Sequence, residues 1–359
     1  MHHTINSREH TSRRGSVYRS SPLFLALSVK TANKNTCMIL NYLGILSGLI
    51  LLIFGADRFV IGASGTARSI GMPTLIIGLV IVGLGTSAPE ILVGTVAALE
   101  GKTEIAIGNA LGSNIANIGL VLGATVIIRP VIIASAMLKH EFILMVLAII
   151  ITFLLMADQN LERLDGILLL LCLAATIYWI IRIARRSTEA DPLADEFEQE
   201  LSTKLSLRKS IFMLIFGLLV LLAGAELLVR CAVVVARHFG MSDLIIGLTI
   251  IAIGTSLPEL ATSIMSVLKK EADIAIGNII GSNMFNMLAV ISVPALIHPT
   301  GFSSEVLLRD FPIMLGLTLL MGWMVFIHGA GRFDRIEGCV LMLCFIAYQC
   351  WLFMGTGIS

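Results

Sequence analysis

Two short segments of this sequence decide its fold: Gly85-Thr86-Ser87-Ala88-Pro89-Glu90 and, 169 residues later, Gly254-Thr255-Ser256-Leu257-Pro258-Glu259. Each lies inside a long apolar run. Each is followed by a second shared motif, Gly-Asn-x-x-Gly-Ser-Asn-x-x-Asn, which begins at Gly108 in the first copy and at Gly277 in the second. Shared apolar composition alone would not align Pro, Glu and Asn in one register, so the chain contains an internal repeat.

The composition places the chain in a membrane. Of its 359 residues, 57% are hydrophobic and 14% are charged, whereas a soluble globular domain carries about 25% charged residues. A soluble enzyme, a disordered chain and a secreted disulfide scaffold are therefore excluded, and the expected partner is the lipid bilayer. The net charge of +1 predicts no nucleic-acid partner. The six cysteines lie in or beside apolar runs and are interpreted as small core residues.

Ten apolar runs are long enough to be membrane-spanning helices, each of which needs about 20 mostly apolar residues. They cover roughly 39–68, 73–99, 104–128, 138–157, 164–183, 208–238, 243–268, 273–297, 306–328 and 335–355. An odd number of spans in each copy forces the second copy into the membrane upside down. The predicted fold is an all-α polytopic membrane protein with ten transmembrane helices in two inverted five-helix repeats.

The polar stretches divide the chain into four parts. We expect residues 1–37 to be an N-terminal extension that is either disordered or not translated, with Met38 as the true start. Residues 38–183 form the first repeat, 184–207 a hydrophilic linker, and 208–359 the second repeat.

The distribution of basic residues predicts the orientation. Lys and Arg are concentrated in the loops that share a side with the central linker, and cytoplasmic loops are the ones enriched in these residues. We therefore expect a multi-pass protein of the plasma membrane with a cytoplasmic linker and with both termini outside.

Glu90 and Glu259 are the residues most indicative of function. Each lies in the middle of an apolar span, where a carboxylate is costly and by default marks an ion or substrate pathway. The structural alternative is a protonated Glu bonded to a neighbouring helix. That alternative is disfavoured because the same Glu recurs in the inverted copy with the same neighbours.

The neighbours of these glutamates favour a cation site. Pro89 and Pro258 lack an amide hydrogen and clash with the carbonyl four residues earlier, which frees backbone oxygens. Hydroxyl oxygens on the same turns come from Thr86, Ser87, Thr255 and Ser256. Hard cations such as Na⁺ and Ca²⁺ prefer carboxylate, carbonyl and hydroxyl oxygens. No Cys or His shares these segments, which disfavours zinc or copper.

The second motif adds polar side chains on one helix face. Asn109, Ser113 and Asn117 are spaced by four residues, as are their counterparts in the second copy. One interpretation is that they join helices, since small and polar residues pack spans together. We favour ion ligation for Ser113, Asn117, Ser282 and Asn286, and we leave both roles open for Asn114 and Asn283.

A further acidic pair matches across the repeats. Asp57 and Glu226 each follow a Gly-Ala dipeptide toward one end of the first and sixth spans. We expect them to act in a gate or in structural pairing rather than in the central site.

These paired motifs resemble the α-repeats of the cation/calcium antiporter superfamily. Over about residues 38–356 the chain is similar to a prokaryotic sodium/calcium exchanger, close to the YrbG-type inner-membrane members. The resemblance implies ion sites around Glu90 and Glu259, with backbone oxygens near Gly83 and Ala252 and no resident cofactor. Many members carry Asp where Asn286 stands, which argues against potassium coupling.

The function predicted from the sequence is antiport of Na⁺ for Ca²⁺ by alternating access. Two carboxylates balance one Ca²⁺ or two Na⁺, so the same site serves each ion in turn. The alternatives are exchange of Ca²⁺ or another divalent cation for H⁺, a passive channel, and an intramembrane hydrolase that uses the acid pair.

Overall fold

The described part of the chain is almost entirely helical. The computed structural model describes residues 34–132, 138–188, 205–241, 250, 252–328 and 332–356. Within these residues, nine helical segments are long and apolar enough to cross a membrane: Met38–Ile70, Thr74–Leu99, Thr103–Ile128, Leu138–Leu155, Arg163–Ile183, Leu207–His238, Ala272–Ile297, Val306–His328 and Arg335–Leu352. A helix satisfies its backbone hydrogen bonds internally, as a segment in lipid must. The prediction of an all-α polytopic membrane protein is confirmed.

Nine of the ten predicted spans coincide with these segments. The tenth, 243–268, is described only at residue 250 and from Ala252 onward, where α12 (Ala252–Thr255) precedes α13 (Leu257–Leu268). Most of the predicted linker, residues 189–204, lies outside the described residues, as do residues 1–33 of the predicted extension. α1 (Lys34–Ile70) begins inside that extension.

Four spans are assembled from shorter helical pieces. The second contains α2 (Thr74–Ile77), the π-helical turn η1 (Gly78–Val82), α3 (Gly83–Thr86) and α4 (Ala88–Leu99). The third span contains α5 (Thr103–Ala116), η2 (Asn117–Leu122) and α6 (Gly123–Ile128). The eighth contains α14 (Ala272–Phe285), η4 (Asn286–Val290) and α15 (Ser292–Ile297). The ninth contains η5 (Val306–Asp310), α16 (Phe311–Trp323) and η6 (Met324–His328). The remaining long helices are α7 (Leu138–Leu155), α8 (Arg163–Thr188), α10 (Leu207–His238) and α17 (Arg335–Thr356).

Proline explains the break in the middle of the second span. The helix is interrupted at Ser87, whose φ and ψ are −80° and 7°, and α4 then starts with Pro89 in its first turn. Proline has no amide hydrogen and is tolerated only in the first turn of a helix. The same interruption recurs at Ser256, with Pro258 in the first turn of α13. Each glutamate therefore lies immediately after a break in its helix.

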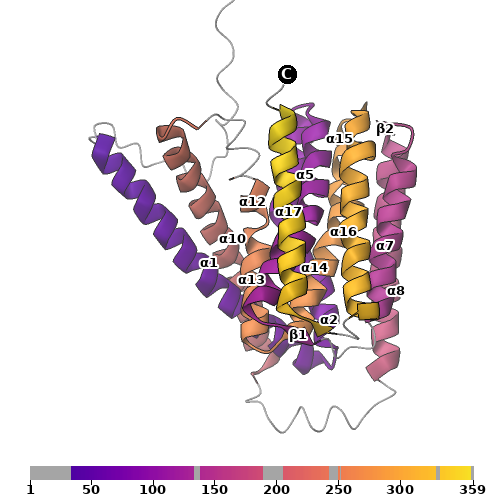
Figure 1. Ribbon diagram of the computed structural model, residues 1–359. Helices are drawn as coiled ribbons and strands as arrows, with labels where there is room; N and C mark the ends of the chain where they lie inside the picture. The colour runs from indigo at the N-terminus through magenta and orange to yellow at the C-terminus, as the bar shows by residue number, and fades with distance from the viewer. Residues whose placement is uncertain are drawn as a thin grey trace, which may run out of the picture. The chain divides into compact units, whose positions relative to one another are not determined.

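Two short antiparallel strand pairs show that the repeats are inverted. β1 (Val131–Ile132) pairs with β4 (Arg332–Phe333), and β2 (Asn160–Leu161) pairs with β3 (Thr300–Gly301). β1 follows the third span of the first repeat, and β3 follows the matching span of the second. In Figure 1, β1 lies at the lower end of the bundle, whereas β2, the partner of β3, lies at the upper end. Matching points of the two repeats thus reach opposite faces.

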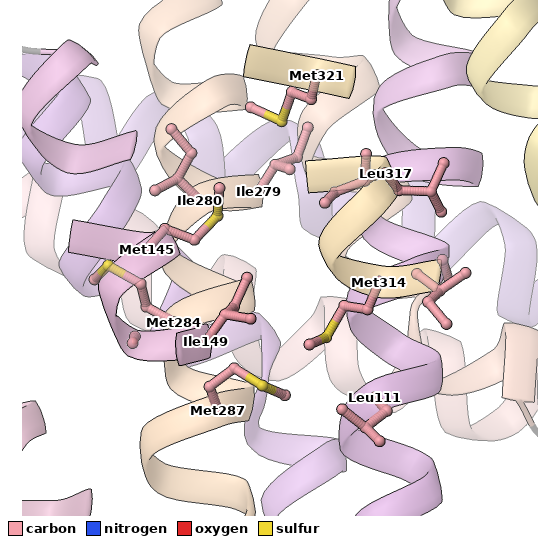
Figure 2. Close-up of a cluster of buried hydrophobic side chains, with 14 of the residues drawn as sticks. Leu111, Met145, Ile149, Ile279, Ile280, Met284, Met287, Met314, Leu317 and Met321 are labelled. Carbon is pink, nitrogen blue, oxygen red and sulfur yellow. The ribbon is translucent and has the colours of Figure 1, made fainter. Parts of the chain in front are cut away.

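The third and eighth spans form the centre of the bundle. The apolar window of the eighth span is 89% buried and that of the third is 72% buried, whereas the window of α1 is only 17% buried. Methionines fill the space between α7, α14 and α16 in Figure 2, where Met145, Met284, Met314 and Met321 are labelled. Unbranched thioether side chains fill such irregular gaps. The Gly-Asn-x-x-Gly-Ser-Asn-x-x-Asn motif of the eighth span is therefore shielded from lipid.

Glycines bring the backbones of α1 and α10 into direct contact, and Figure 1 shows these helices side by side. A Cβ atom on Gly55 would lie 2.4 Å from the amide nitrogen of Leu221, and one on Gly217 would lie 2.3 Å from that of Phe59. Equivalent close approaches occur at Gly48, Gly62 and Gly224. No other residue permits this separation, so the two helices are held together along their length.

We expect Gly62→Ala to destabilise the protein by about 1–3 kcal/mol, the usual cost of overpacking. Its Cβ would lie 2.2 Å from the amide nitrogen of Leu214. The matched control is Gly316→Ala in α16, where no atom lies within 4 Å of the added Cβ. Thermal unfolding of the purified proteins in detergent measures the difference. Equal melting temperatures for the two variants would show that α1 and α10 are not in backbone contact.

Candidate ion-binding site

The two intramembrane glutamates occupy matching positions. Glu90 lies in the first turn of α4 and Glu259 in the first turn of α13, each just beyond a break in its helix. Both side chains are 0% exposed. A buried carboxylate must be paired, coordinated or neutralised. What surrounds the two side chains therefore decides their role.

Each glutamate is bonded in the same way by the helix that follows it. The hydroxyl of Ser113 donates to Oε1 of Glu90, and that of Ser282 donates to Oε1 of Glu259, both at 3.4 Å. The amides of Asn109 and Asn278 donate to the backbone oxygens of Glu90 and Glu259, also at 3.4 Å. The second motif of each repeat thus lines the glutamate of its own repeat.

Other contacts join the two repeats at this place. The Ser87 hydroxyl donates to Oε1 of Glu259 at 3.4 Å, and the hydroxyls of Thr86 and Ser282 are 3.3 Å apart. The Thr255 hydroxyl hydrogen-bonds Glu90. Because hydroxyls of each repeat reach the glutamate of the other, the two motifs build one shared site rather than two separate ones.

Backbone oxygen is also present in the site. The carbonyl of Gly83 accepts hydrogen bonds from the Ser87 amide at 3.1 Å and from the Ser282 hydroxyl at 3.3 Å. A Cβ on Gly83 would lie 2.9 Å from the amide nitrogen of Ser282, so glycine permits this approach. Ala252, the matching residue of the second repeat, is the first residue of α12, and its side chain lies outside the described ones.

Several buried oxygens in the site have no hydrogen-bond partner within the described part of the chain. They are Oε2 of Glu90, Oε2 of Glu259, Oγ of Ser256, and Oδ1 of Asn117 and of Asn286. A buried unsatisfied polar group costs about 1–3 kcal/mol. Two carboxylates, a hydroxyl and two amide oxygens are the ligands that Na⁺ and Ca²⁺ prefer. The residues present therefore fit a hard cation as the bound species.

The described residues hold no cluster suited to a softer metal. Across them, no group of three or more His, Cys, Asp and Glu side chains lies together. The two carboxylate Oε1 atoms accept only from hydroxyl groups among the printed contacts of the described residues. The negative charge of the pair is thus surrounded by neutral oxygen atoms.

Asp57 and Glu226 lie in ion pairs away from these contacts. Asp57 is 2.7 Å from the ammonium of Lys269 and 3.5 Å from Arg58. Glu226 pairs with Arg230 one turn further along α10. A second ion pair, Arg68 to Glu271 at 2.7 Å, also joins α1 to the loop after α13.

The matching loop of the first repeat is paired differently. Lys102 forms an ion pair with Glu100 of its own loop at 2.7 Å. The described ion pairs of Asp57 and Arg68 thus join α1 to the loop after α13.

Sequence reasoning missed the role of Asn278 and the contact between Asn114 and Asn283. The Thr86 hydroxyl donates to Oδ1 of Asn278 at 3.0 Å, and the side-chain amide nitrogen of Asn278 donates to Oγ of Ser263 at 3.0 Å. Asn114 donates to the backbone oxygen of Asn283 at 3.2 Å. The register of the repeat placed Asn278 in the motif, but only the fold shows which side chains meet.

Comparison with known protein families shows which family has this arrangement. The family described as "Sodium/calcium exchanger protein" matches residues 40–182 and 209–354, which are both repeats. The chain belongs to this family. The resemblance inferred from the paired motifs is therefore confirmed.

Individual relatives match three quarters or more of the chain. CaxA of Alkalimonas amylolytica, a candidate antiporter, is 48% identical over 314 residues, which are 86% of this chain and 97% of CaxA. The inner membrane protein YrbG of Escherichia coli K12 is 41% identical over 275 residues, 76% of this chain and 85% of YrbG. The Ca²⁺/H⁺ antiporter ChaA of Bacillus subtilis is 25% identical over 290 residues, 75% of this chain and 80% of ChaA.

A solved structure has the same fold. The sodium/calcium exchanger from Methanococcus jannaschii superposes with a TM-score of 0.75 at 30% identity, over 87% of this chain and 98% of that chain. The chain is thus a multi-pass membrane protein and a cation/Ca²⁺ antiporter of the exchanger type. It is a transporter and not an enzyme, which removes the intramembrane hydrolase from the alternatives.

We expect Ser282→Ala to weaken Ca²⁺ binding more than Ser113→Ala does. The Ser282 hydroxyl contacts Glu259, Thr86 and the Gly83 carbonyl, whereas a single contact, to Glu90, is found for Ser113 among the described residues. A hydrogen bond to a charged group contributes about 1.5–3 kcal/mol, which corresponds to about tenfold or more in Kd.

Isothermal titration of purified protein with Ca²⁺ measures this difference. Thr318→Val is the control, because within the described residues its buried hydroxyl bonds only its own helix, at the Met314 carbonyl. An equal Kd for Ser282→Ala and Thr318→Val would remove Ser282 from the site.

Proposed function

We propose that this antiporter exchanges Na⁺ for Ca²⁺ and that Glu90 and Glu259 carry the ions. The observation that supports this most strongly is the pair of buried carboxylates whose Oε2 atoms lack a partner within the described residues. Two carboxylates carry a formal charge of −2, which one Ca²⁺ or two Na⁺ neutralise. One site therefore serves both ions in turn, and binding of one excludes the other.

The ligand set extends from the carboxylates to neutral oxygens of both repeats. The proposed side-chain ligands are Thr86, Ser87, Ser113, Asn117, Thr255, Ser256, Ser282 and Asn286, with backbone oxygens at Gly83 and Ala252. Burial supports this assignment, since Ser87, Ser256 and Ser282 are at most 1% exposed. A mixed oxygen shell without further charge binds a cation and still allows the cation to dissociate.

The cost of an empty site supplies the coupling. Removing a charge from water into the protein interior costs several kcal/mol unless the charge is compensated. A site that carries −2 with no cation is therefore disfavoured during the change of access. Only the loaded forms cross readily, and this links Ca²⁺ movement in one direction to Na⁺ movement in the other.

We assign the change of access to α1 and α10. Their apolar windows are only 17% and 22% buried, against 89% for the eighth span. Their backbones touch at Gly55 and Gly217, which supports movement of the two helices as one unit. They slide past the central spans, which stay fixed and carry the ligands.

We place the protein in the plasma membrane, corresponding to a bacterial inner membrane, with the linker in the cytoplasm and both termini outside. The basic residues of the linker side support this orientation. The name of YrbG, an inner membrane protein, supports the location. In that orientation, Lys269 and Arg68 lie on the cytoplasmic side.

Proton-coupled exchange is the second candidate function. The similarity to ChaA, which is named a Ca²⁺/H⁺ antiporter, favours it, and a carboxylate pair binds protons as well as metal ions. Protons need only the carboxylates, however. The unpartnered oxygens of Ser256, Asn117 and Asn286 in the described structure are better matched to a metal cation.

In proteoliposomes, we expect ⁴⁵Ca²⁺ to accumulate when an outward Na⁺ gradient is imposed, at a rate at least tenfold above that without Na⁺. This uptake should require neither a pH gradient nor K⁺, because the site has Asn286 and not a third carboxylate at this position. Uptake driven by the pH gradient without Na⁺ would establish proton coupling instead. Uptake that ignores both gradients would contradict antiport.

Glu90→Gln and Glu259→Gln should each reduce Na⁺-driven Ca²⁺ uptake at least a hundredfold. Each substitution halves the charge of the site while preserving the shape of the side chain, so one Ca²⁺ is no longer balanced. The control is Glu162→Gln, since Glu162 is exposed outside the site. Melting temperatures confirm that the variants are folded. Normal uptake by either site variant would overturn the central assignment.

A further inference from the structure

Four asparagines meet where the two repeats face each other. Asn114 and Asn117 come from α5 and η2 of the first repeat, and Asn283 and Asn286 come from α14 and η4 of the second. All four are at most 1% exposed. Asn117 and Asn286 are proposed ligands, whereas Asn114 and Asn283 have no role in the site as described above.

Two hydrogen bonds cross from the first repeat to Asn283. The Asn117 amide nitrogen donates to Oδ1 of Asn283 at 3.2 Å. The Asn114 amide nitrogen donates to the backbone oxygen of Asn283, also at 3.2 Å. The bond at the Asn117 nitrogen leaves the Asn117 oxygen buried and without a partner among the described residues. Asn283 thereby determines which end of the Asn117 amide is free.

The mirror-image bonds are not formed in this structure. Because Asn114 matches Asn283 and Asn117 matches Asn286, the mirror of the first bond would join the Asn286 nitrogen to Oδ1 of Asn114. Both of these atoms are buried and without a partner in the described structure, as is the Asn283 nitrogen. The cluster therefore forms the two bonds to Asn283. The atoms that would form the two mirror-image bonds to Asn114 are present but have no such partner among the described residues.

We propose that Asn114 and Asn283 are positioning residues, each of which orients the ligand amide of the opposite repeat so that its oxygen faces the transported cation. Asn283 holds Asn117 in the conformation described here, and Asn114 holds Asn286 in the conformation that opens to the other side. The proposal rests on the proposed role of Asn117 and Asn286 as cation ligands.

The reason lies in the shape of the amide group. Its oxygen and its nitrogen have nearly the same size, so packing alone does not choose between them. An amide oxygen ligates a cation, whereas an amide NH₂ turned toward the cation repels it. An acceptor that bonds the nitrogen fixes the choice, in the way that ligands of metal sites are oriented by the groups behind them.

A double-mutant cycle on the Ca²⁺ Kd tests the first pair. Isothermal titration is carried out on the full-length protein and on Asn117→Ala, Asn283→Ala and the double variant. We expect Asn283→Ala alone to raise the Kd about fivefold to tenfold. In the Asn117→Ala background, the same change should raise the Kd less than twofold, because no ligand amide remains to be oriented. Additivity is otherwise the rule for independent sites.

The control cycle combines Asn117→Ala with Thr318→Val, whose effects should multiply. Because an alanine leaves a cavity, Asn283→Leu serves as a second variant that keeps the volume and removes the acceptor. The mirror pair, Asn114 with Asn286, should show the same loss of additivity as Asn283 with Asn117.

The outcomes separate this proposal from the proposed function. Independent, multiplying effects for Asn283 and Asn117, with melting temperatures unchanged, overturn the positioning role and leave the exchanger intact. Loss of the folded state in both Asn283 variants also overturns it, because Asn283 would then be purely structural. A wild-type protein that binds no Ca²⁺ contradicts the proposed function itself.

Discussion

The structure depends on two carboxylates placed where no water reaches them. Glu90 and Glu259 are fully buried within apolar spans, and a charge in such surroundings is tolerated only with compensation. The helix breaks at Ser87 and Ser256, which precede the prolines, bring hydroxyl and carbonyl oxygens to the depth of the acids. Irregular backbone at membrane depth is permitted only where it is buried in protein or lines a cavity. The fold thus surrounds the acids with oxygen and covers that oxygen with apolar helices.

Inverted repetition makes the site from two equivalent halves and yet leaves it asymmetric. The bonds from Ser113 to Glu90 and from Ser282 to Glu259 have the same length in both repeats. Ser87 bonds the glutamate of the other repeat, whereas the hydroxyl of its counterpart Ser256 has no partner among the described residues. The described conformation does not satisfy the two halves equally. Exchange of the roles of the two halves is a route to a second conformation, which the alternating access proposed above requires.

Much of the fold could be predicted from the sequence, because spans in lipid are set by length and hydrophobicity. The inverted repeat followed from the register of Pro89 and Pro258. The candidate ion-binding residues were chosen because intramembrane acids lie beside hydroxyls. The contact of Asn117 with Asn283 could not be predicted, since it joins residues from different repeats. The π-helical turns were missed for a related reason, because they depend on packing between spans. The ligand assignment itself stays a prediction.

The ion pairs of Asp57 with Lys269 and of Arg68 with Glu271 tie α1 to the loop after α13 at one end of the bundle. Exposed ion pairs contribute about 0–1 kcal/mol, so these would favour by a small amount a conformation in which α1 contacts this loop. A transporter is a catalyst and obeys microscopic reversibility, so this bias leaves the final ratio of ion concentrations unchanged. The bias changes the relative rates of the two steps in which access changes sides. It therefore changes which side of the membrane the binding sites face for most of each turnover.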